Sequence, residues 1–154
     1  MERRKANLSI STLQRLHRAL SVPLSALFEA DGTTAESAAD DFVRRMHGRP
    51  VLSVADTGML KELLSPHCDR DLQMMIITLL RDSGSREVLV GAGEKAGLVL
   101  EGAVVLDLDG HQVDLEAGGS FQFRSTAPHR VRNESDRVAQ LVWIMNTQPP
   151  IIHL

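Results

Sequence analysis

The sequence has few aromatic residues and a single cysteine. Among its 154 residues there is no Tyr, one Trp and four Phe, which argues against a nucleic-acid surface built on aromatic stacking. Cys68 alone excludes an internal disulfide and a cysteine-rich zinc site. No run approaches the roughly 18 apolar residues of a membrane span, and the first ten residues lack the apolar core of a secretory signal. We therefore expect a cytoplasmic protein without a membrane partner.

The charges are distributed unevenly along the chain. The formal net charge is −3, from 17 Lys and Arg against 20 Asp and Glu. Residues 1–30 nevertheless contain five basic and two acidic side chains, so the acidic excess lies in the remainder. A basic end on an acidic body suggests a nucleic-acid-facing head joined to a separate body, although thirty residues also reach such an excess by chance.

The N-terminal part has a helical pattern. Within residues 11–21, Ser11 and Gln14 fit a capping box, and three leucines at helical spacing form one apolar stripe. Residues 24–28 suggest a second, shorter helix. Two helices of this length do not close a core without further packing. The small, polar and acidic segment 30–48 is expected to be a linker with one helical turn.

From Arg49 onward the pattern becomes that of strands. Short apolar segments recur at roughly ten-residue intervals, separated by turn signals, of which Asp109-Gly110 is the strongest because a type I′ hairpin turn needs positive φ at both central residues. This spacing predicts an antiparallel sandwich or small barrel. The expected strands are 51–54, 60–64, 72–80, 88–90, 98–108, 113–115, 120–123, 129–132 and 139–145.

Two stretches resemble known families. The motifs VLEG (Val99–Gly102), AGGSFQF (Ala117–Phe123) and PHRVRN (Pro128–Asn133) resemble the core of a small cupin barrel. Residues 1–28 resemble the second half of an Xre-like (lambda-repressor-like) helix-turn-helix domain. Together they resemble one-component regulators that join such a DNA-binding domain to a cupin sensor.

The resemblance implies a mainly β fold. It would be a cupin-type antiparallel β-barrel (double-stranded β-helix) preceded by a short α-helical remnant of a helix-turn-helix domain. The expected organisation is a partial DNA-binding domain at residues 1–29, a linker at 30–48 and a cupin domain at 49–154.

The resemblance to the DNA-binding domain begins late in that domain. The scaffold helix and most of the recognition helix would precede Met1, so the chain as written has no helix to place in a major groove. Arg3, Arg4 and Lys5 would still contact phosphates. We therefore expect weak, salt-sensitive DNA binding without sequence preference.

The metal motif of cupins is mostly absent. Counting back from Gly102, the positions at which metal-binding cupins carry Glu and two His hold Lys95, Leu89 and Gly91, and only the last ligand, His129, remains. One imidazole opposite a cationic amine does not hold a divalent metal. We expect no metal and no cofactor. No G-x-S-x-G, P-loop or H-E-x-x-H motif is present, so an enzyme is not expected either.

A ligand site is expected inside the barrel instead. If Lys95 and His129 both face the interior, the cavity holds a positive charge with no acid assigned beside it, and an anionic effector is the natural partner. Asn133 would add a hydrogen bond, and Phe121 and Phe123 would line or plug the barrel. The alternatives place Lys95 in a loop with its ammonium in solvent and make His129 an internally satisfied barrel residue.

The resulting prediction is a transcriptional regulator whose metal-free cupin barrel senses a small-molecule effector. Its partners would be DNA and that effector, and it would act as a homodimer that shifts between DNA-competent and incompetent arrangements. The alternative is a stand-alone ligand-binding or dimerisation cupin without DNA binding. A cupin enzyme with atypical residues is less favoured.

Overall fold

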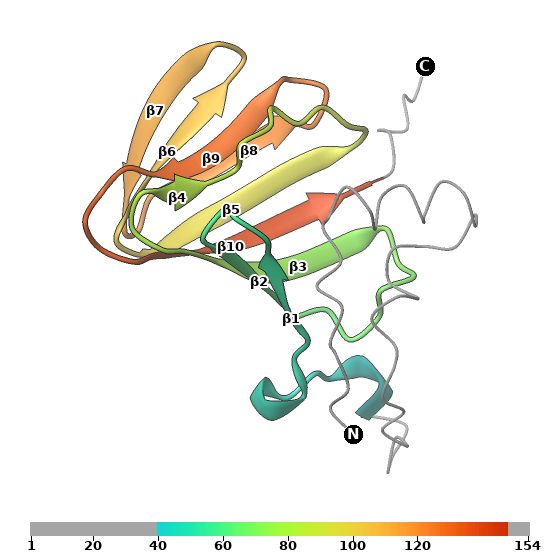
Figure 1. The fold of residues 1–154 in the computed structure, drawn as a ribbon. Coiled ribbons are helices and arrows are strands. Elements are labelled where there is room, and N and C mark those ends of the chain that lie inside the picture. The colour runs from blue at the N-terminus through green and yellow to red at the C-terminus, as the bar shows by residue number, and fades with distance from the viewer. Residues whose placement is uncertain (1–39, 148–154) are drawn as a thin grey trace, which may run out of the picture.

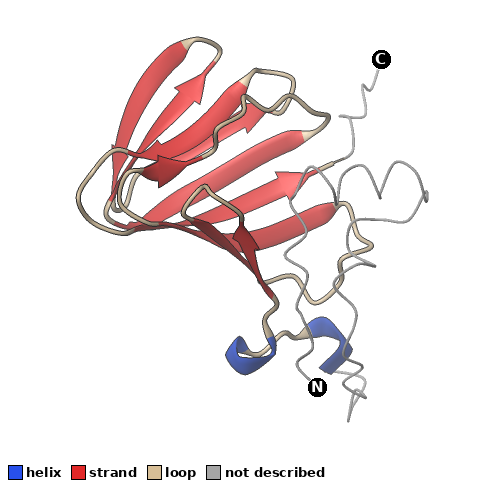
Figure 2. Ribbon diagram, viewed as in Figure 1, coloured by secondary structure: helices blue, strands red, loops and turns tan. Residues whose placement is uncertain are grey.

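The structure, a computed structural model, describes residues 40–147. The expectation of a mainly β fold is confirmed, because this part of the chain forms ten strands and only two short 3-10 turns (Figures 1 and 2). The strands are β1 (Val51–Val54), β2 (Met59–Leu63), β3 (Leu72–Leu79), β4 (Ser83–Gly84), β5 (Glu94–Glu101), β6 (Ala103–Leu108), β7 (His111–Glu116), β8 (Ser120–Arg124), β9 (His129–Asn133) and β10 (Ala139–Asn146).

Two antiparallel sheets form the layers of the barrel. The larger has the strand order β1-β2-β3-β10-β5-β8, and the smaller has the order β4-β9-β6-β7. Figure 1 shows the smaller sheet facing the larger one across the core. The C-terminal strand β10 lies in the middle of the larger sheet, between β3 and β5. Strands distant in sequence therefore converge on one interior.

The alternation of side chains along each strand builds that interior. In β9, His129, Val131 and Asn133 are buried, whereas Arg130 and Arg132 between them are half-exposed. In β10 the buried positions are Ala139, Leu141 and Trp143. This period of two is expected for strands that are covered on one face. The core cluster also includes Leu79, Val99, Val104, Leu106 and Phe123.

Glycine and aspartate set the turns. Asp109 and Gly110 have φ of 50° and 80°, so the hairpin between β6 and β7 has the positive φ values that the sequence predicted. The expected continuous strand 98–108 is wrong: it breaks at Gly102 into β5 and β6. Gly102 has φ of 72°, and a Cβ there would lie 2.7 Å from the Val138 carbonyl oxygen. Only glycine fits this corner without strain.

Two other expectations differ from the structure. The predicted strand 88–90 is reduced to a single bridge between Leu89 and His129. The two-residue strand β4 was not expected, and it pairs with the end of β9.

Most of the expectations for the N-terminal part concern residues that the structure does not describe. The helical remnant at 1–29, and residues 30–39 of the expected linker, lie outside the described residues. Within residues 40–48 the chain forms two 3-10 turns, η2 (Asp40–Phe42) and η3 (Met46–Gly48), in place of the single expected turn (Figure 2). In the described part of the chain, no helix has the length and apolar character needed to cross a bilayer.

Candidate functional site

A cavity of about 340 Å³ lies between the two sheets. Its volume falls at the lower end of the range of small-molecule sites. Most of its wall is apolar, with a few polar groups, which is the usual composition of a ligand pocket. The lining residues are Pro50, Leu52, Met59, Lys61, Leu63, Met75, Ile77, Ser85, Leu89, Val90, Lys95, His129, Arg130, Val131, Trp143 and Met145.

Lys95 and His129 meet in this cavity. Lys95 lies on β5 in phase with the buried residues Gly97 and Val99, so its side chain points inward. Its Nζ lies 2.6 Å from Nε2 of His129 and 5.8 Å from the centroid of the Trp143 ring. The structure thus brings together two of the residues predicted from the sequence and places the Lys95 ammonium in the barrel rather than in solvent.

The hydrogen bonds of His129 define its tautomer. Nδ1 lies 2.7 Å from the Ala127 carbonyl oxygen, which can only accept, so Nδ1 carries the proton. Nε2 is then left as the acceptor for the Lys95 ammonium. Burial is the main cause that lowers the pKa of His129, and the Lys95 charge lowers it further. His129 is therefore a neutral imidazole that orients Lys95.

Lys61 adds a second ammonium that sequence reasoning missed. It lies on β2, between Met59 and Leu63 on the same face of the strand, and lines the cavity. Burial lowers its pKa. Among residues 40–147, no carboxylate lies within ion-pair distance of Lys61 or Lys95.

The positive charge of Lys61 also affects the pKa of Lys95. Its pKa is lowered to about 8, first by burial and then by the positive charge of Lys61. Both effects disfavour the ammonium form. The described lining includes no Asp or Glu to offset them. The cavity is therefore electropositive and lacks a counter-charge from this part of the chain.

Phe121 and Phe123 lie elsewhere in the interior. Their rings pack on each other at 5.8 Å and on Trp143 at 5.1 and 6.3 Å between centroids. Phe123 also contacts the His129 ring at 4.9 Å. Gly97 makes room for Phe121, because a Cβ at this position would lie 2.3 Å from the Phe121 ring. Neither phenylalanine lines the cavity, so both act here as packing behind Trp143 and His129.

Asn133 faces inward but does not reach the cavity. Its Nδ2 donates to the carbonyl oxygens of Leu79, Leu80 and Arg137, and its Oδ1 accepts from the amide and hydroxyl of Ser135. The ligand-contacting role predicted for Asn133 does not fit this position. The side chain instead joins the turn after β9 to the end of β3.

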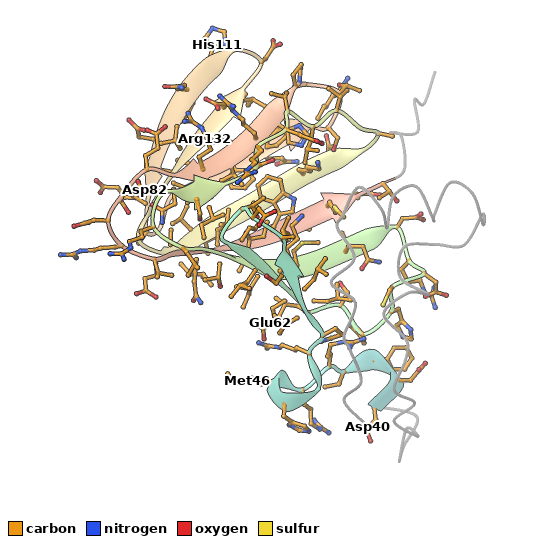
Figure 3. The ribbon with its side chains drawn as sticks, in the orientation of Figure 1. Asp40, Met46, Glu62, Asp82, His111 and Arg132 are labelled. Atoms are coloured by element: carbon orange, nitrogen blue, oxygen red, sulfur yellow. The ribbon has the colours of Figure 1, made fainter. Side chains whose placement is uncertain are left out.

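The arginines of β9 point to the outer side of the smaller sheet. Arg130 and Arg132 both pair with Asp107 on the neighbouring strand β6, and Arg132, labelled in Figure 3, also pairs with Glu134. These two arginine bonds lower the pKa of Asp107. Arg130 reaches the edge of the cavity lining, but its charge is already matched by Asp107.

The donor set does not fit a metal ion. Leu89 and Gly91 offer no side-chain ligand, and the remaining imidazole nitrogen of His129 accepts from the Lys95 ammonium. Nowhere in residues 40–147 do three His, Cys, Asp or Glu side chains gather as a metal site would need. His111, for example, lies at the tip of the β6–β7 hairpin (Figure 3).

A larger depression of about 800 Å³ lies over β4 and the turns beside it. It is open to solvent and is lined by charges of both signs, including Arg81, Asp82 and Arg86. The predicted DNA contacts Arg3, Arg4 and Lys5 lie outside the described residues. The cavity around Lys95 is less open and more apolar than this depression, and it is the stronger candidate site.

Known proteins share sequence features with this chain. Residues 84–145 match the family model of the cupin domain. The chain is 26% identical to the HTH-type transcriptional regulator PuuR of Escherichia coli (strain K12) over 143 residues, which cover 92% of this chain and 75% of the relative.

Solved structures share the fold. An HTH_3 family transcriptional regulator from Vibrio cholerae has a TM-score of 0.63 at 22% identity, with 92% of this chain and 74% of that chain covered. The hydroxypropylphosphonic acid epoxidase from S. wedmorenis has a TM-score of 0.58 at 18% identity, with 90% and 75% covered. The same architecture thus occurs in a regulator and in an enzyme, so the fold alone does not distinguish these two functions. The described residues have the cupin fold, residues 84–145 match the family model of the cupin domain, and the chain is similar in sequence to an HTH-type transcriptional regulator.

Proposed function

We propose that this chain is the ligand-sensing part of a transcriptional regulator, in which a small molecule occupies the barrel cavity and changes DNA binding. The single observation that carries this proposal is the mostly apolar cavity between the two sheets, with a few polar side chains in its wall. The relation to an HTH-type transcriptional regulator over 92% of the chain supports the regulatory context.

The position of the first strand supports coupling between the cavity and the N-terminal part. Pro50 and Leu52 line the cavity, and they directly follow η3 (Met46–Gly48). β1 is held at the sheet edge by pairing with β2, and Arg49 bonds to Glu62 on β2. A ligand that packs against Pro50 and Leu52 contacts the first strand after the N-terminal part. Such a ligand shifts the equilibrium between the DNA-competent and incompetent arrangements only by its difference in affinity for the two.

We also propose a homodimer, as the sequence predicted. The outer face of the larger sheet carries exposed Leu72 and Met74 on β3 and exposed Leu98 and Leu100 on β5. These strands flank β10 on both sides, so the four side chains form an apolar surface across three adjacent strands. A second copy of the chain packed against this surface would remove these apolar side chains from water. The molar mass in solution, from size-exclusion chromatography with light scattering, tests this state.

The regulatory proposal is tested by measuring DNA affinity with the cavity empty and filled. The 154-residue chain is titrated onto a fluorescent DNA duplex at low salt, with and without a compound that binds the cavity. We expect the apparent Kd for DNA to change when the cavity is filled. An unchanged Kd at saturating ligand contradicts the regulatory proposal and favours a stand-alone ligand-binding cupin.

A further inference from the structure

Two ammonium groups approach the cavity from the inner face of the larger sheet, on strands that lie on either side of the β3–β10 pair. Lys61 lies on β2 opposite Ile77 of β3, and Lys95 lies on β5 opposite Met145 of β10. Both line the same cavity, and the charge on Lys61 is felt at Lys95. Two like charges in one partly desolvated space are unfavourable unless a negative charge joins them.

The groups packed around the lysines supply no such charge. His129 is neutral and accepts one hydrogen from Lys95, and Trp143 offers its ring face to the same ammonium. Arg130 is matched by Asp107 outside the cavity. The neighbouring acid Glu62 is bonded to Arg49, and Glu94 to Gln122. Two N–H groups of Lys95, and the whole ammonium of Lys61, have no hydrogen-bond acceptor from the described residues.

The rest of the cavity wall is apolar and matches the apolar part of a small ligand. Met59, Leu63, Met75, Trp143 and Met145 contribute side chains to the lining beside the lysines. Methionine side chains adapt to the shape of an apolar ligand, and the Trp143 ring offers a flat face. A strongly hydrated inorganic ion would leave these surfaces uncovered. The cavity therefore favours a molecule with one charged end and one apolar end.

We propose that the cavity binds a small organic anion, with its anionic oxygens between Lys61 and Lys95 and its apolar body against Trp143 and the methionines. This inference rests on the proposed function, in which the bound molecule is the effector. A carboxylate and a phosphate monoester share the required chemistry, because both present anionic acceptors to ammonium donors.

The chain provides its own probe for the test. Trp143 is its only tryptophan and lines the cavity, so intrinsic fluorescence reports on this site alone. Four compounds with the same six-carbon body are titrated at millimolar concentrations: hexanoate, hexyl phosphate, 1-hexanol and hexylamine. We expect saturable changes in emission with one or both anions, and weaker changes or none with the alcohol and the amine. The ratio of the two anion affinities distinguishes a carboxylate from a phosphate ligand.

Variants then assign the head-group contacts. K61M and K95M should each weaken binding of the better anion at least about tenfold, and the double variant should abolish it. The matched control is R124M, which removes an exposed cation from β8, the strand beside Lys95, and should leave the affinity unchanged. K61Q and K95Q are measured in parallel as a second pair of neutral variants, with a thermal melt of each protein, so that a folding defect is separated from a loss of binding.

The outcomes separate the two proposals. Anion binding that is unchanged in both lysine variants, or stronger binding of hexylamine, overturns the anionic ligand while small-molecule binding in the cavity stands. Failure of all four compounds to change Trp143 emission counts against both. Equal losses in R124M and K95M would show a general charge effect and would also overturn the inference.

Discussion

The Lys95 ammonium donates a hydrogen bond of 2.6 Å to Nε2 of His129. The other ring nitrogen of His129 determines which of the two residues is the donor in this bond. Because Nδ1 donates to the Ala127 carbonyl oxygen, Nε2 stays an acceptor and holds the ammonium in the cavity. A cation occupies the place where the family resemblance puts a metal ligand. The stability of the barrel and its ligand affinity should therefore both depend on the charge of Lys95.

Replacing Lys95 by methionine should not destabilise the fold near neutral pH. Lys95 has a pKa of about 8 in the folded chain, below its usual 10.5, so its ammonium form is disfavoured by folding. K95M removes this cost and fills the space with a side chain of similar length, although it leaves His129 Nε2 without its donor. We expect a Tm at pH 7 equal to or above that of the wild type.

The advantage of K95M should shrink as the pH rises. Between about pH 8 and 10.5 the unfolded chain binds a proton at Lys95 that the folded chain has lost, so the stability of the wild type increases with pH in this window. Melting curves of both proteins from pH 7 to the top of this window check the trend, with R124M as control. A K95M protein that loses stability relative to the wild type at pH 7 contradicts this account.

Much of the fold was predictable because its signals are local. Alternating side chains and the Asp109-Gly110 turn identify strands and a hairpin without knowledge of their partners. The break at Gly102 is different, because it depends on the close approach of Val138 from a distant part of the chain. The strand β4 pairs at only two residues, Ser83 and Gly84, so it has no alternation to detect.

The site was predictable only in part, for a similar reason. Lys95 and His129 were found from their positions in the cupin-like motifs, and the structure brings them together. Lys61 could not be found, because Met59, Lys61 and Leu63 alternate with Leu60, Glu62 and Leu64, and each face has two apolar residues and one charge. Burial of the first face is decided by tertiary pairing, in which Glu62 bonds to Arg49 and Lys61 is left inside.

Asn133 should prove to be a structural residue rather than a ligand contact. N133A removes a buried amide whose two N–H groups are shared among three carbonyl oxygens and whose Oδ1 accepts two bonds from Ser135. We expect a loss of about 2–3 kcal/mol in the free energy of unfolding, measured by urea denaturation. The anion affinity read from Trp143 should be unchanged. A weakened anion affinity with unchanged stability would instead support the role predicted from the sequence.

Binding to duplex DNA by this chain should depend steeply on salt. The prediction rests on Arg3, Arg4 and Lys5, which lie outside the described residues. Replacing the three by glutamine should lower the slope of log Kobs against log salt by about 0.9 for each phosphate that the variant no longer neutralises. Fluorescence anisotropy on two duplexes of unrelated sequence measures both slope and preference. A footprint on one defined palindrome at physiological salt would contradict binding without sequence preference.

Anion affinity should fall as the pH rises through the pKa of Lys95. The ligand needs the ammonium form, which the free protein loses above about pH 8, and bound anion favours uptake of that proton. The groups that face Lys95 are Lys61 on β2, His129 on β9 and Trp143 on β10, and the described lining contributes no acid that would titrate in the opposite direction. The hexanoate carboxylate stays ionised throughout, as ordinary carboxylates do above about pH 6. Affinity should therefore fall above about pH 8, by up to about tenfold per pH unit for each proton lost. Titrations of Trp143 emission with hexanoate across this range measure the profile.

K95R keeps its charge at all these pH values, so its affinity should fall at a higher pH than that of the wild type. If the wild type and K95R lose affinity at the same pH, another group controls binding and Lys95 is not the head-group contact.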